Sequence, residues 1–297
     1  MDKTNATGLI MVIDGGGSTC RARLVAPDGT ILGAATGGAA NPTTDAVAAR
    51  RTIVDTLRAA YADAGRDSAL ATGDLLYLAL AGTPEREHFL APLRDELPFA
   101  RIVLSSDLAA GVQAALGDGD GVVVNVGTGS YFVSRRAGEL WRIGGRGMIV
   151  SDECSGAWLG LNLLRDTVHA HDRLIEPSPL TDRVLEECGG DIDALVIFAR
   201  HASPRDFAAF APMLLTADNA GDPIARGLMA RALGEMTRIL DRHDATGLGR
   251  IVLIGGLADA YRARLPAPYR ALCRDPLGDT LSGAIELARR EAGAVAR

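Results

Sequence analysis

The 297-residue chain contains a single lysine, Lys3, and this scarcity limits how the protein could handle phosphate. A P-loop, the active site of a protein kinase and a Schiff-base enzyme each need a lysine within the folded domain. Any phosphate chemistry in this chain therefore depends on glycine backbone, hydroxyl groups, arginine and a metal ion.

Cysteine is also scarce, because Cys20, Cys154, Cys188 and Cys273 are scattered and form no C-x-x-C pair. A structural zinc site and a disulfide framework are therefore not expected, and reduced thiols are the simplest interpretation. The net charge of −6 and the lack of a basic run argue against a nucleic-acid partner.

Long hydrophobic runs are absent as well. No stretch approaches 18 apolar residues, so we expect no membrane partner, and the run at residues 9–13 is too short for a signal peptide. These features predict a cytoplasmic protein. At 47% hydrophobic residues the chain can bury a large core, and its length favours two domains.

The order of predicted elements repeats along the chain. Each half begins with three strands joined by a glycine-rich loop and a tight turn: residues 9–14, 20–26 and 30–35, then residues 121–126, 131–134 and 139–143. In the first half we expect a helix capped by Thr43 or Thr44 and ended by Gly65, a strand at 75–80, a helix from Pro84, a strand at 101–104 and a helix at 107–116.

After residue 153 the pattern is mostly helical, apart from a strand at 250–254, and it closes with a helix at 281–292. A Gly/Asp-rich run at 117–120 marks the expected boundary, which gives domains 1–118 and 119–297. The last helix belongs to the second domain or packs back on the first.

Two glycine-rich loops follow apolar strands and suit phosphate binding. In the first, Asp14 precedes Gly15-Gly16-Gly17-Ser18-Thr19, where the glycines let the backbone approach an anion and the carboxylate suits Mg²⁺. The second is Gly127-Thr128-Gly129-Ser130. Ordinary hairpin turns remain the alternative for both loops. Neither matches a dinucleotide fingerprint, because each leads into a strand.

Three further segments carry candidate chemistry. Gly255-Gly256 follows a strand and suits a stacked nucleoside, although a plain strand-to-helix turn fits equally well. Asp107 opens a helix, either as its N-cap or as a general base. The run 144–147 leads to Asp152 and Glu153, which either complement a helix dipole or bind a polyol or amine. The five histidines show no metal-ligand spacing.

The ordered set of motifs resembles the BadF/BadG/BcrA/BcrD-type ATPase family and, within it, the bacterial glucosamine and N-acetylglucosamine kinases. The motifs that carry the resemblance cover nearly the whole chain: residues 13–23, 41–42, 106–107, 125–130, 144–156, 255–257 and 279–287. The resemblance implies the α/β actin-like ATPase fold of sugar kinases, a duplicated ribonuclease H-like unit in two lobes with a cleft between them.

The resemblance also implies roles for individual residues. Asp107 would be the catalytic base, and Asp14 the carboxylate linked to Mg²⁺. The residues that would contact ATP are Gly16, Gly17, Ser18, Thr19, Gly127, Thr128, Gly129, Gly255 and Gly256. Those that would contact the sugar are Asn41, Asp107, Thr128, Ser130, Gly145 and Asp152.

Two departures from the family pattern favour a sugar with a free amine. Arg146 stands where many N-acetylhexosamine kinases have Trp, and Ser18-Thr19-Cys20 replaces the commoner Thr-Lys-Thr. The expected reaction is transfer of the ATP γ-phosphoryl group to the 6-hydroxyl of glucosamine, with N-acetylglucosamine as the alternative substrate. An ATPase activator carrying an iron–sulfur cluster and a non-catalytic sugar sensor are further alternatives. The family also suggests a homodimer.

Overall fold

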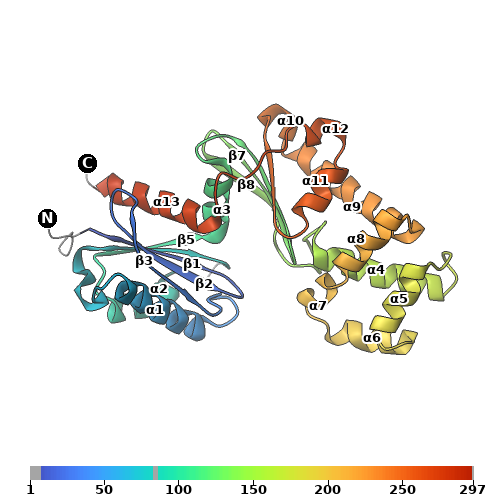
Figure 1. Ribbon diagram of the computed structural model, residues 1–297, viewed down its shortest axis with the longest axis horizontal. Helices are drawn as coiled ribbons and strands as arrows, with labels where there is room; N and C mark the ends of the chain where they lie inside the picture. Colours follow the sequence, from blue (N-terminus) through green and yellow to red (C-terminus); the bar gives the residue numbers. More distant parts are fainter. Residues whose placement is uncertain (1–7, 83–85, 296–297) are drawn as a thin grey trace. The chain divides into compact units, whose positions relative to one another are not determined.

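The computed structural model describes residues 8–82 and 86–295, which form two compact units (Figure 1). The first unit comprises residues 1–118 and 277–297, and the second comprises residues 119–276. Residues 277–297 thus group with residues 1–118 in this division. Within the described ranges, no helix is both long and apolar enough to cross a membrane.

The first unit is built on a five-stranded mixed sheet with the order β3-β2-β1-β4-β5. The first three strands form an antiparallel meander, and β4 and β5 run parallel to β1. The strands are β1 (Ile10–Gly15), β2 (Cys20–Val25), β3 (Ile31–Gly37), β4 (Leu75–Leu80) and β5 (Arg101–Ser106). The three parallel strands therefore end at one edge of the sheet.

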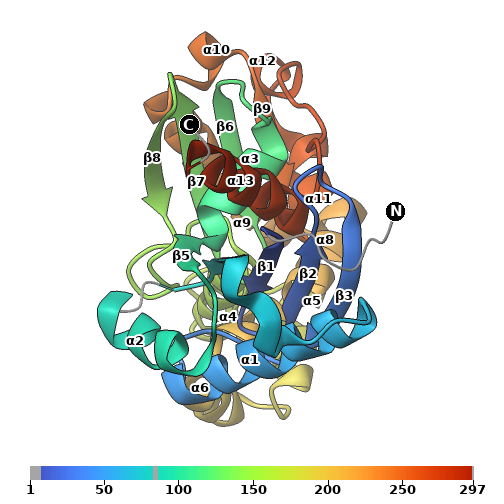
Figure 2. The same ribbon diagram turned by 90° about the vertical axis from the view of Figure 1, so that its left-hand side faces the viewer.

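Alternating side chains of β1 and β4 fill two separate cores, one on each face of this sheet. Met11 and Ile13 pack with α1 (Ala46–Asp63) and α2 (Arg86–Glu96). Ile10 and Val12 pack with α3 (Asp107–Leu116) and α13 (Thr280–Val295). Figures 1 and 2 show α1 and α13 on opposite faces of the sheet. A three-layer unit follows from this period-two pattern.

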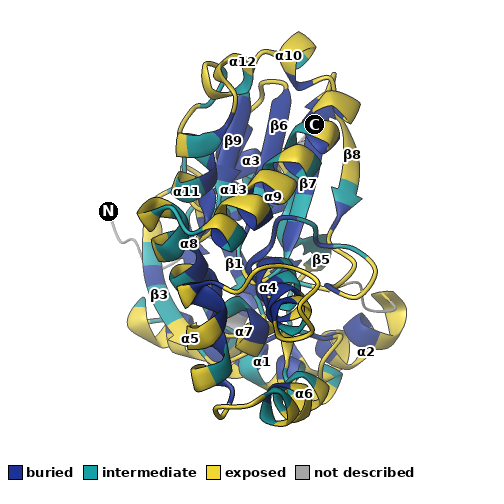
Figure 3. Ribbon diagram, turned by 90° about the vertical axis from the view of Figure 1, so that its right-hand side faces the viewer, coloured by how far each residue is buried: buried dark blue, intermediate teal, exposed yellow. Residues whose placement is uncertain are grey.

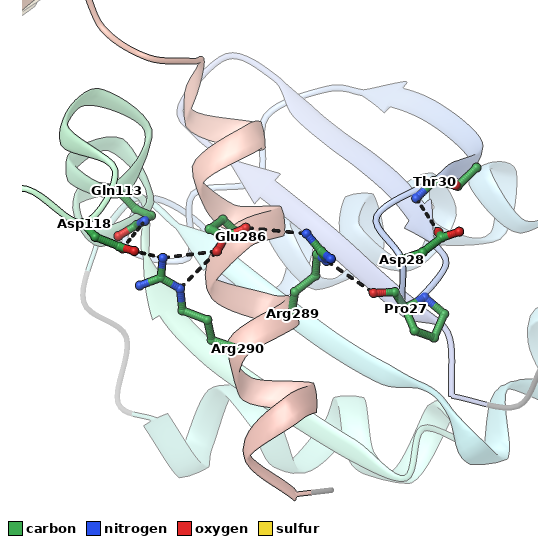
Figure 4. Close-up of polar contacts among 8 residues, drawn as sticks. All are labelled: Pro27, Asp28, Thr30, Gln113, Asp118, Glu286, Arg289 and Arg290. Carbon is green, nitrogen blue, oxygen red and sulfur yellow. Dashed lines mark hydrogen bonds and ion pairs between the residues drawn. The ribbon is translucent and has the colours of Figure 1, made fainter.

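The helix α13 is fixed closely against the rest of the first unit. A Cβ at Gly283 would lie 2.1 Å from the carbonyl oxygen of Ala110, so glycine is needed where α13 meets α3. Further along the same helix, Arg289 Nε donates to the carbonyl of Pro27 at 3.3 Å, and Arg290 pairs with Asp118 (Figure 4). Together these contacts hold α13 against α3 and against the turn between β2 and β3.

The second unit contains a four-stranded sheet with the order β8-β7-β6-β9. The strands are β6 (Gly121–Val126), β7 (Ser130–Arg136), β8 (Glu139–Gly144) and β9 (Ile251–Ile254). The helices are α4 (Gly156–His171), α5 (Pro179–Glu187), α6 (Ile192–His201), α7 (Pro204–Ala208), α8 (Ala211–Ala220), α9 (Pro223–Arg242), α10 (Ala245–Leu248), α11 (Ala258–Arg264) and α12 (Ala267–Arg270). Figure 3 shows β6 and β9 buried, with exposed residues along the outer sides of the helices. One hydrophobic core joins the sheet and the helices.

The structure corrects several expected element boundaries. Asp45, and not Thr43 or Thr44, caps α1, because its side chain accepts from the backbone N–H groups of Val47 and Ala48. The strand expected at 101–104 continues to Ser106, and a short 3-10 helix, Ser68–Gly73, has no counterpart in the expected pattern. The expected start of a helix at Pro84 lies outside the described residues.

Candidate functional site

The carboxyl ends of three parallel strands place two candidate carboxylates at one edge of the first sheet. In the register, Gly15 pairs with Leu80 and Leu80 pairs with Ser106. Asp14 and Asp107 therefore emerge at the same edge, two strand spacings apart, or about 10 Å along the sheet. This edge is where open α/β sheets commonly bind ligands.

The loop that follows β1 is linked by backbone hydrogen bonds to the segment carrying Asn41. Gly16 N donates to Thr19 O at 2.9 Å and closes the loop, and Ala40 N donates to Gly16 O at 2.9 Å. The Asn41 side chain accepts from Thr43 N at 2.9 Å. Asn41 is thus held beside the loop, although its amide oxygen already accepts one hydrogen bond within its own turn.

The glycines of the first loop have different reasons for being glycine. A Cβ at Gly15 would lie 2.7 Å from Leu80 Cδ2, so packing against β4 explains that glycine. A Cβ at Gly17 would meet nothing within 4 Å, and its φ is not left-handed. Neither sterics nor backbone conformation requires glycine at position 17. Its side chain-free, exposed backbone is therefore suited to close approach by a ligand.

Asp14 is paired with an arginine that the sequence analysis did not assign to the site. Arg21, on β2, donates through Nε (3.1 Å) and Nη2 (2.5 Å) to Asp14 Oδ2, and through Nη1 (2.8 Å) to Asp279 Oδ2. Burial of Arg21 opposes its charge, but the hydrogen bond and the charge of Asp14 outweigh burial and raise the pKa of Arg21. Arg21 could have been recognised from its register, because it lies opposite Asp14 in the β1–β2 pair.

The carboxylate of Asp14 fits a metal ion that is held mainly by other ligands. Its side chain is 13% exposed and offers hard oxygen donors. In the described part of the chain, no group of three or more His, Cys, Asp or Glu side chains could hold a metal ion. Magnesium commonly keeps several waters and phosphate oxygens beside one or two carboxylates, so a single Asp matches that pattern.

Asp107 is the first residue of α3 and does not cap it. The cap is Ser106, whose side chain accepts from Ala109 N at 3.1 Å. The Asp107 side chain accepts from Leu108 N at 2.8 Å, and the residue is half-buried. The N-cap interpretation of Asp107 is therefore wrong, and its carboxylate is oriented by the first turn of the helix.

The second glycine loop closes the amino end of α4 with its carbonyl groups. Gly156 N donates to Gly127 O at 2.7 Å, and Ala157 N donates to Thr128 O at 3.1 Å. Gly127 N donates in turn to Gly129 O at 2.9 Å. The loop is thus fixed on a helix while Thr128 stays exposed.

The segment Gly255-Gly256 lies beside the same loop, because β9 runs parallel to β6. A Cβ at Gly255 would lie 2.4 Å from the carbonyl of Val126, and its φ is +96°. A Cβ at Gly256 would meet nothing within 4 Å. Packing and conformation therefore explain Gly255, whereas Gly256 resembles Gly17 in having no such reason.

Asp152 joins the 144–147 run to the second glycine loop. It is buried, with a left-handed φ of 62°, and its Oδ1 accepts from Arg146 N (3.0 Å) and Gly147 N (3.1 Å). A Cβ at Gly129 would lie 2.7 Å from Asp152 Oδ2. A strained backbone that holds a buried carboxylate is typical of functional sites.

Ser130 adds to this group by donating from its hydroxyl to Glu153 O at 2.6 Å. The second unit therefore brings together Gly129, Ser130, Asp152 and the run containing Gly145. The first unit brings together Asp14, residues 16–19, Asn41 and the edge carrying Asp107.

The cysteines show no arrangement suited to an iron–sulfur cluster. All four are free thiols, and Cys20, Cys154 and Cys188 are buried. Burial raises the pKa of the Cys154 thiol, which donates to the carbonyl of Ala232 at 3.1 Å. Buried, protonated thiols do not favour the activator alternative.

Comparisons with known proteins agree with this architecture. A glucosamine kinase of Vibrio cholerae is 32% identical over 277 residues, which cover 93% of this chain and 94% of the relative. The crystal structure of a candidate N-acetylglucosamine kinase from Chromobacterium violaceum is 33% identical, with a TM-score of 0.81, covering 95% of this chain and 99% of the other.

A second structure, a candidate N-acetylglucosamine kinase from Porphyromonas gingivalis, is 21% identical with a TM-score of 0.70 and the same coverage, and shows the shared fold. These likenesses confirm the expected α/β actin-like ATPase fold. The family model of the BadF/BadG/BcrA/BcrD ATPases matches residues 13–265. On this match and the two glycine loops it spans, the chain belongs to the BadF/BadG/BcrA/BcrD ATPase family.

Proposed function

We propose that the protein is an ATP-dependent amino-sugar kinase that phosphorylates the 6-hydroxyl of glucosamine. The observation that carries this proposal is the edge of the first sheet, where β1 and β5 place Asp14 and Asp107 together with the Asn41 segment. The relatives at 32% and 33% identity are described as glucosamine and N-acetylglucosamine kinases, and they support the class of reaction.

The phosphates of ATP are assigned to backbone groups and hydroxyls, since the chain has no lysine after Lys3. Gly17, Ser18 and Thr19 supply one set of donors, and Thr128 and Gly129 supply the other. Gly16 and Gly127 are assigned to the same phosphate contacts through the close approach of their backbone, because their N–H groups already close the two loops. Gly255 and Gly256 are assigned to the adenosine. The open space around Gly17 and Gly256 supports these assignments.

Asp107 is assigned the role of general base. The sugar 6-oxygen forms a bond to the γ-phosphorus as the bond from that phosphorus to the bridging β–γ oxygen breaks, and ADP leaves. The hydroxyl proton passes to the carboxylate of Asp107. General-base catalysis typically contributes about 10²–10⁴ in rate, and positioning and charge stabilisation supply most of the rest.

Asp14 would hold Mg²⁺, and Mg²⁺ supplies neutralisation of the charge on the phosphate oxygens when bound. The residues of this chain orient the reaction around it: Arg21 holds the Asp14 carboxylate, and the Gly16–Ala40 hydrogen bond holds the loop.

The sugar is assigned to Asn41, Asp107, Thr128, Ser130, Gly145 and Asp152. Because Asp152 Oδ1 is occupied by two backbone N–H groups, Oδ2 is the oxygen available to pair with the ammonium group of glucosamine. This pairing favours the free amine over the acetylated sugar, whose amide is neutral.

A coupled assay across glucosamine, N-acetylglucosamine, mannosamine and glucose tests the proposal. We expect ATP turnover that depends on an amino sugar and is fastest with glucosamine. The Asp107→Asn variant should keep its affinity for ATP and lose about 10²–10⁴ in kcat. Sugar-independent ATP hydrolysis, or a near-normal kcat in Asp107→Asn, would contradict the assignment. Preference for N-acetylglucosamine would favour the alternative substrate, with which the Chromobacterium violaceum relative agrees.

A further inference from the structure

The guanidinium of Arg21 joins two carboxylates that lie 258 and 7 positions away from it in the chain. Its Nε and Nη2 face Asp14, and its remaining terminal nitrogen, Nη1, faces Asp279. The side chain of Asp14 is 13% exposed and that of Asp279 is 58% exposed. The bridge therefore runs from the carboxyl end of β1 to the surface at the beginning of α13.

Asp279 is itself held in place at the beginning of α13. Its Oδ1 accepts from Ser282 N at 3.0 Å, while its Oδ2 accepts from Arg21. Partial burial raises the pKa of Asp279, but hydrogen bonds from Ser282 and the positive charge of Arg21 outweigh burial and lower it. Asp279 is thus a charged group near neutral pH, with each oxygen given a separate partner.

The opposite end of α13 is anchored as well. Arg290 contacts Asp118 and Glu286, and Arg289 reaches the carbonyl of Pro27 (Figure 4). Close packing at Gly283 fixes the first turn of the helix on α3. Because the helix cannot slide without breaking these contacts, it presents Asp279 to Arg21 at a defined position.

Charge explains why a second carboxylate is useful at this point. Arg21 alone would neutralise Asp14 and oppose the approach of a divalent cation. With Asp279 present, the three side chains carry a net charge of −1, and the guanidinium is shared between two acceptors. Removal of the Asp279 charge would leave Arg21 to act on Asp14 alone.

We propose that Asp279 is a positioning residue that, by holding Arg21, keeps the carboxylate of Asp14 available to Mg²⁺ bound with ATP. The inference rests on the proposed function and adds to it a residue of α13 that contacts neither ATP nor the sugar in the assignments above. The last helix of the chain thereby contributes to the metal dependence of nucleotide binding.

Asp279→Asn is the informative variant, because it separates the charge from the helix cap. Asn caps helices as well as Asp does, so its side-chain oxygen can still accept from Ser282 N. Its NH₂ group would then face Arg21, where a donor meets a donor, and the bridge would break. Since exposed ion pairs contribute little to stability, the unfolding temperature should barely change.

The measurement is the affinity for the non-hydrolysable analogue AMPPNP, determined by calorimetry with Mg²⁺ and again in EDTA. In Asp279→Asn, we expect the factor by which Mg²⁺ tightens binding to fall about three- to tenfold, with affinity in EDTA unchanged or higher. If AMPPNP binding weakened equally with Mg²⁺ and in EDTA, Asp279 would have a general structural role and the inference would be overturned. The inference would also be overturned if Mg²⁺ tightened binding by the same factor in the variant and in the unchanged protein.

Asp275→Asn provides a matched control, because Asp275 is also an exposed partner of an arginine, Arg262, at 2.7 Å. This variant should keep the full effect of Mg²⁺ on AMPPNP binding. If the unchanged protein binds no AMPPNP with Mg²⁺, the proposed function fails. If the unchanged protein binds AMPPNP and Mg²⁺ tightens the binding of Asp279→Asn by the same factor, only the role of Asp279 fails.

Discussion

At the scale of single residues, the glycines fall into two groups: those that the fold requires, and those at which the fold leaves open space that suits a ligand. Gly15, Gly255 and Gly283 each occupy a place where a Cβ would collide with a neighbour. Gly17 and Gly256 do not. Gly15, Gly17, Gly255 and Gly256 all follow a strand in the sequence, so this pattern did not distinguish the two groups. Sequence alone could not make this distinction, since it depends on which backbone lies opposite each glycine.

Gly17→Ala tests this distinction. Because the added methyl group meets nothing within 4 Å, we expect an unchanged unfolding temperature. If phosphate approaches this backbone, binding of AMPPNP with Mg²⁺ should weaken about tenfold or more. Gly227→Ala, which also adds a methyl group to open space on α9, should leave the affinity unchanged. Unimpaired binding in Gly17→Ala would remove this loop from the nucleotide site.

The buried carboxylate of Asp152 gives a second prediction at this scale. Asp152→Asn keeps an oxygen for Arg146 N and Gly147 N, so the run should keep its shape. Hydrogen bonds to charged groups contribute about 1.5–3 kcal/mol, so kcat/KM for glucosamine should fall about 10- to 100-fold. Glucose has no ammonium group, and its turnover should fall much less. Equal losses for the two sugars in steady-state assays would contradict an amine-binding role.

At the scale of helices and strands, most of the fold could be predicted from hydrophobic patterns. The duplicated strand meander and the helices of the first unit follow apolar spacing, and their existence is confirmed. Helix caps were harder, because Thr43, Thr44 and Asp45 are all good capping residues and only the backbone selects among them. The Arg21–Asp279 pair could not be predicted, since no local signal links β2 to a helix far along the chain.

The contact between α13 and α3 yields a prediction for an element. Gly283→Ala would force a methyl group to within 2.1 Å of the Ala110 carbonyl, so the helices must separate. Overpacking of this kind costs about 1–3 kcal/mol, which should lower the unfolding temperature. Asp107, the proposed general base, begins α3 and would move with it, so kcat should fall as well.

Gly293→Ala, on the same helix but facing open space, is the matched control. Alanine favours helix over glycine by about 1 kcal/mol, so thermal unfolding of this variant should occur at the same or a higher temperature. Equal stability of Gly283→Ala and Gly293→Ala would argue that the two helices do not pack as closely as described.

At the scale of the whole molecule, we expect His243 in the second unit to contribute to the response to acid. This side chain is buried, its Nδ1 lies 2.9 Å from Ser134 Oγ, and burial lowers its pKa to about 4. Between about pH 4 and 6.5 the unfolded chain therefore binds more protons at this residue than the folded chain. Stability should fall as the pH drops through this window, by up to about 3 kcal/mol.

Urea unfolding at pH 7 and pH 5 measures this effect. The difference in unfolding free energy between the two pH values should be smaller in His243→Asn than in the unchanged protein. His169→Asn, which alters an exposed histidine, should retain the full difference. An unchanged difference in His243→Asn would show that other groups cause the loss of stability in acid.

The membership of α13 in the first unit has a consequence for biosynthesis. Residues 277–297 leave the ribosome only after the entire second unit, so the sheet that bears Asp14 lacks α13 while 158 intervening positions are translated. During that interval the apolar side of β1 and β4 that later meets Leu281, Ala284 and Ala288 is covered only by α3. Nascent chains halted before position 277 should consequently engage chaperones through this surface.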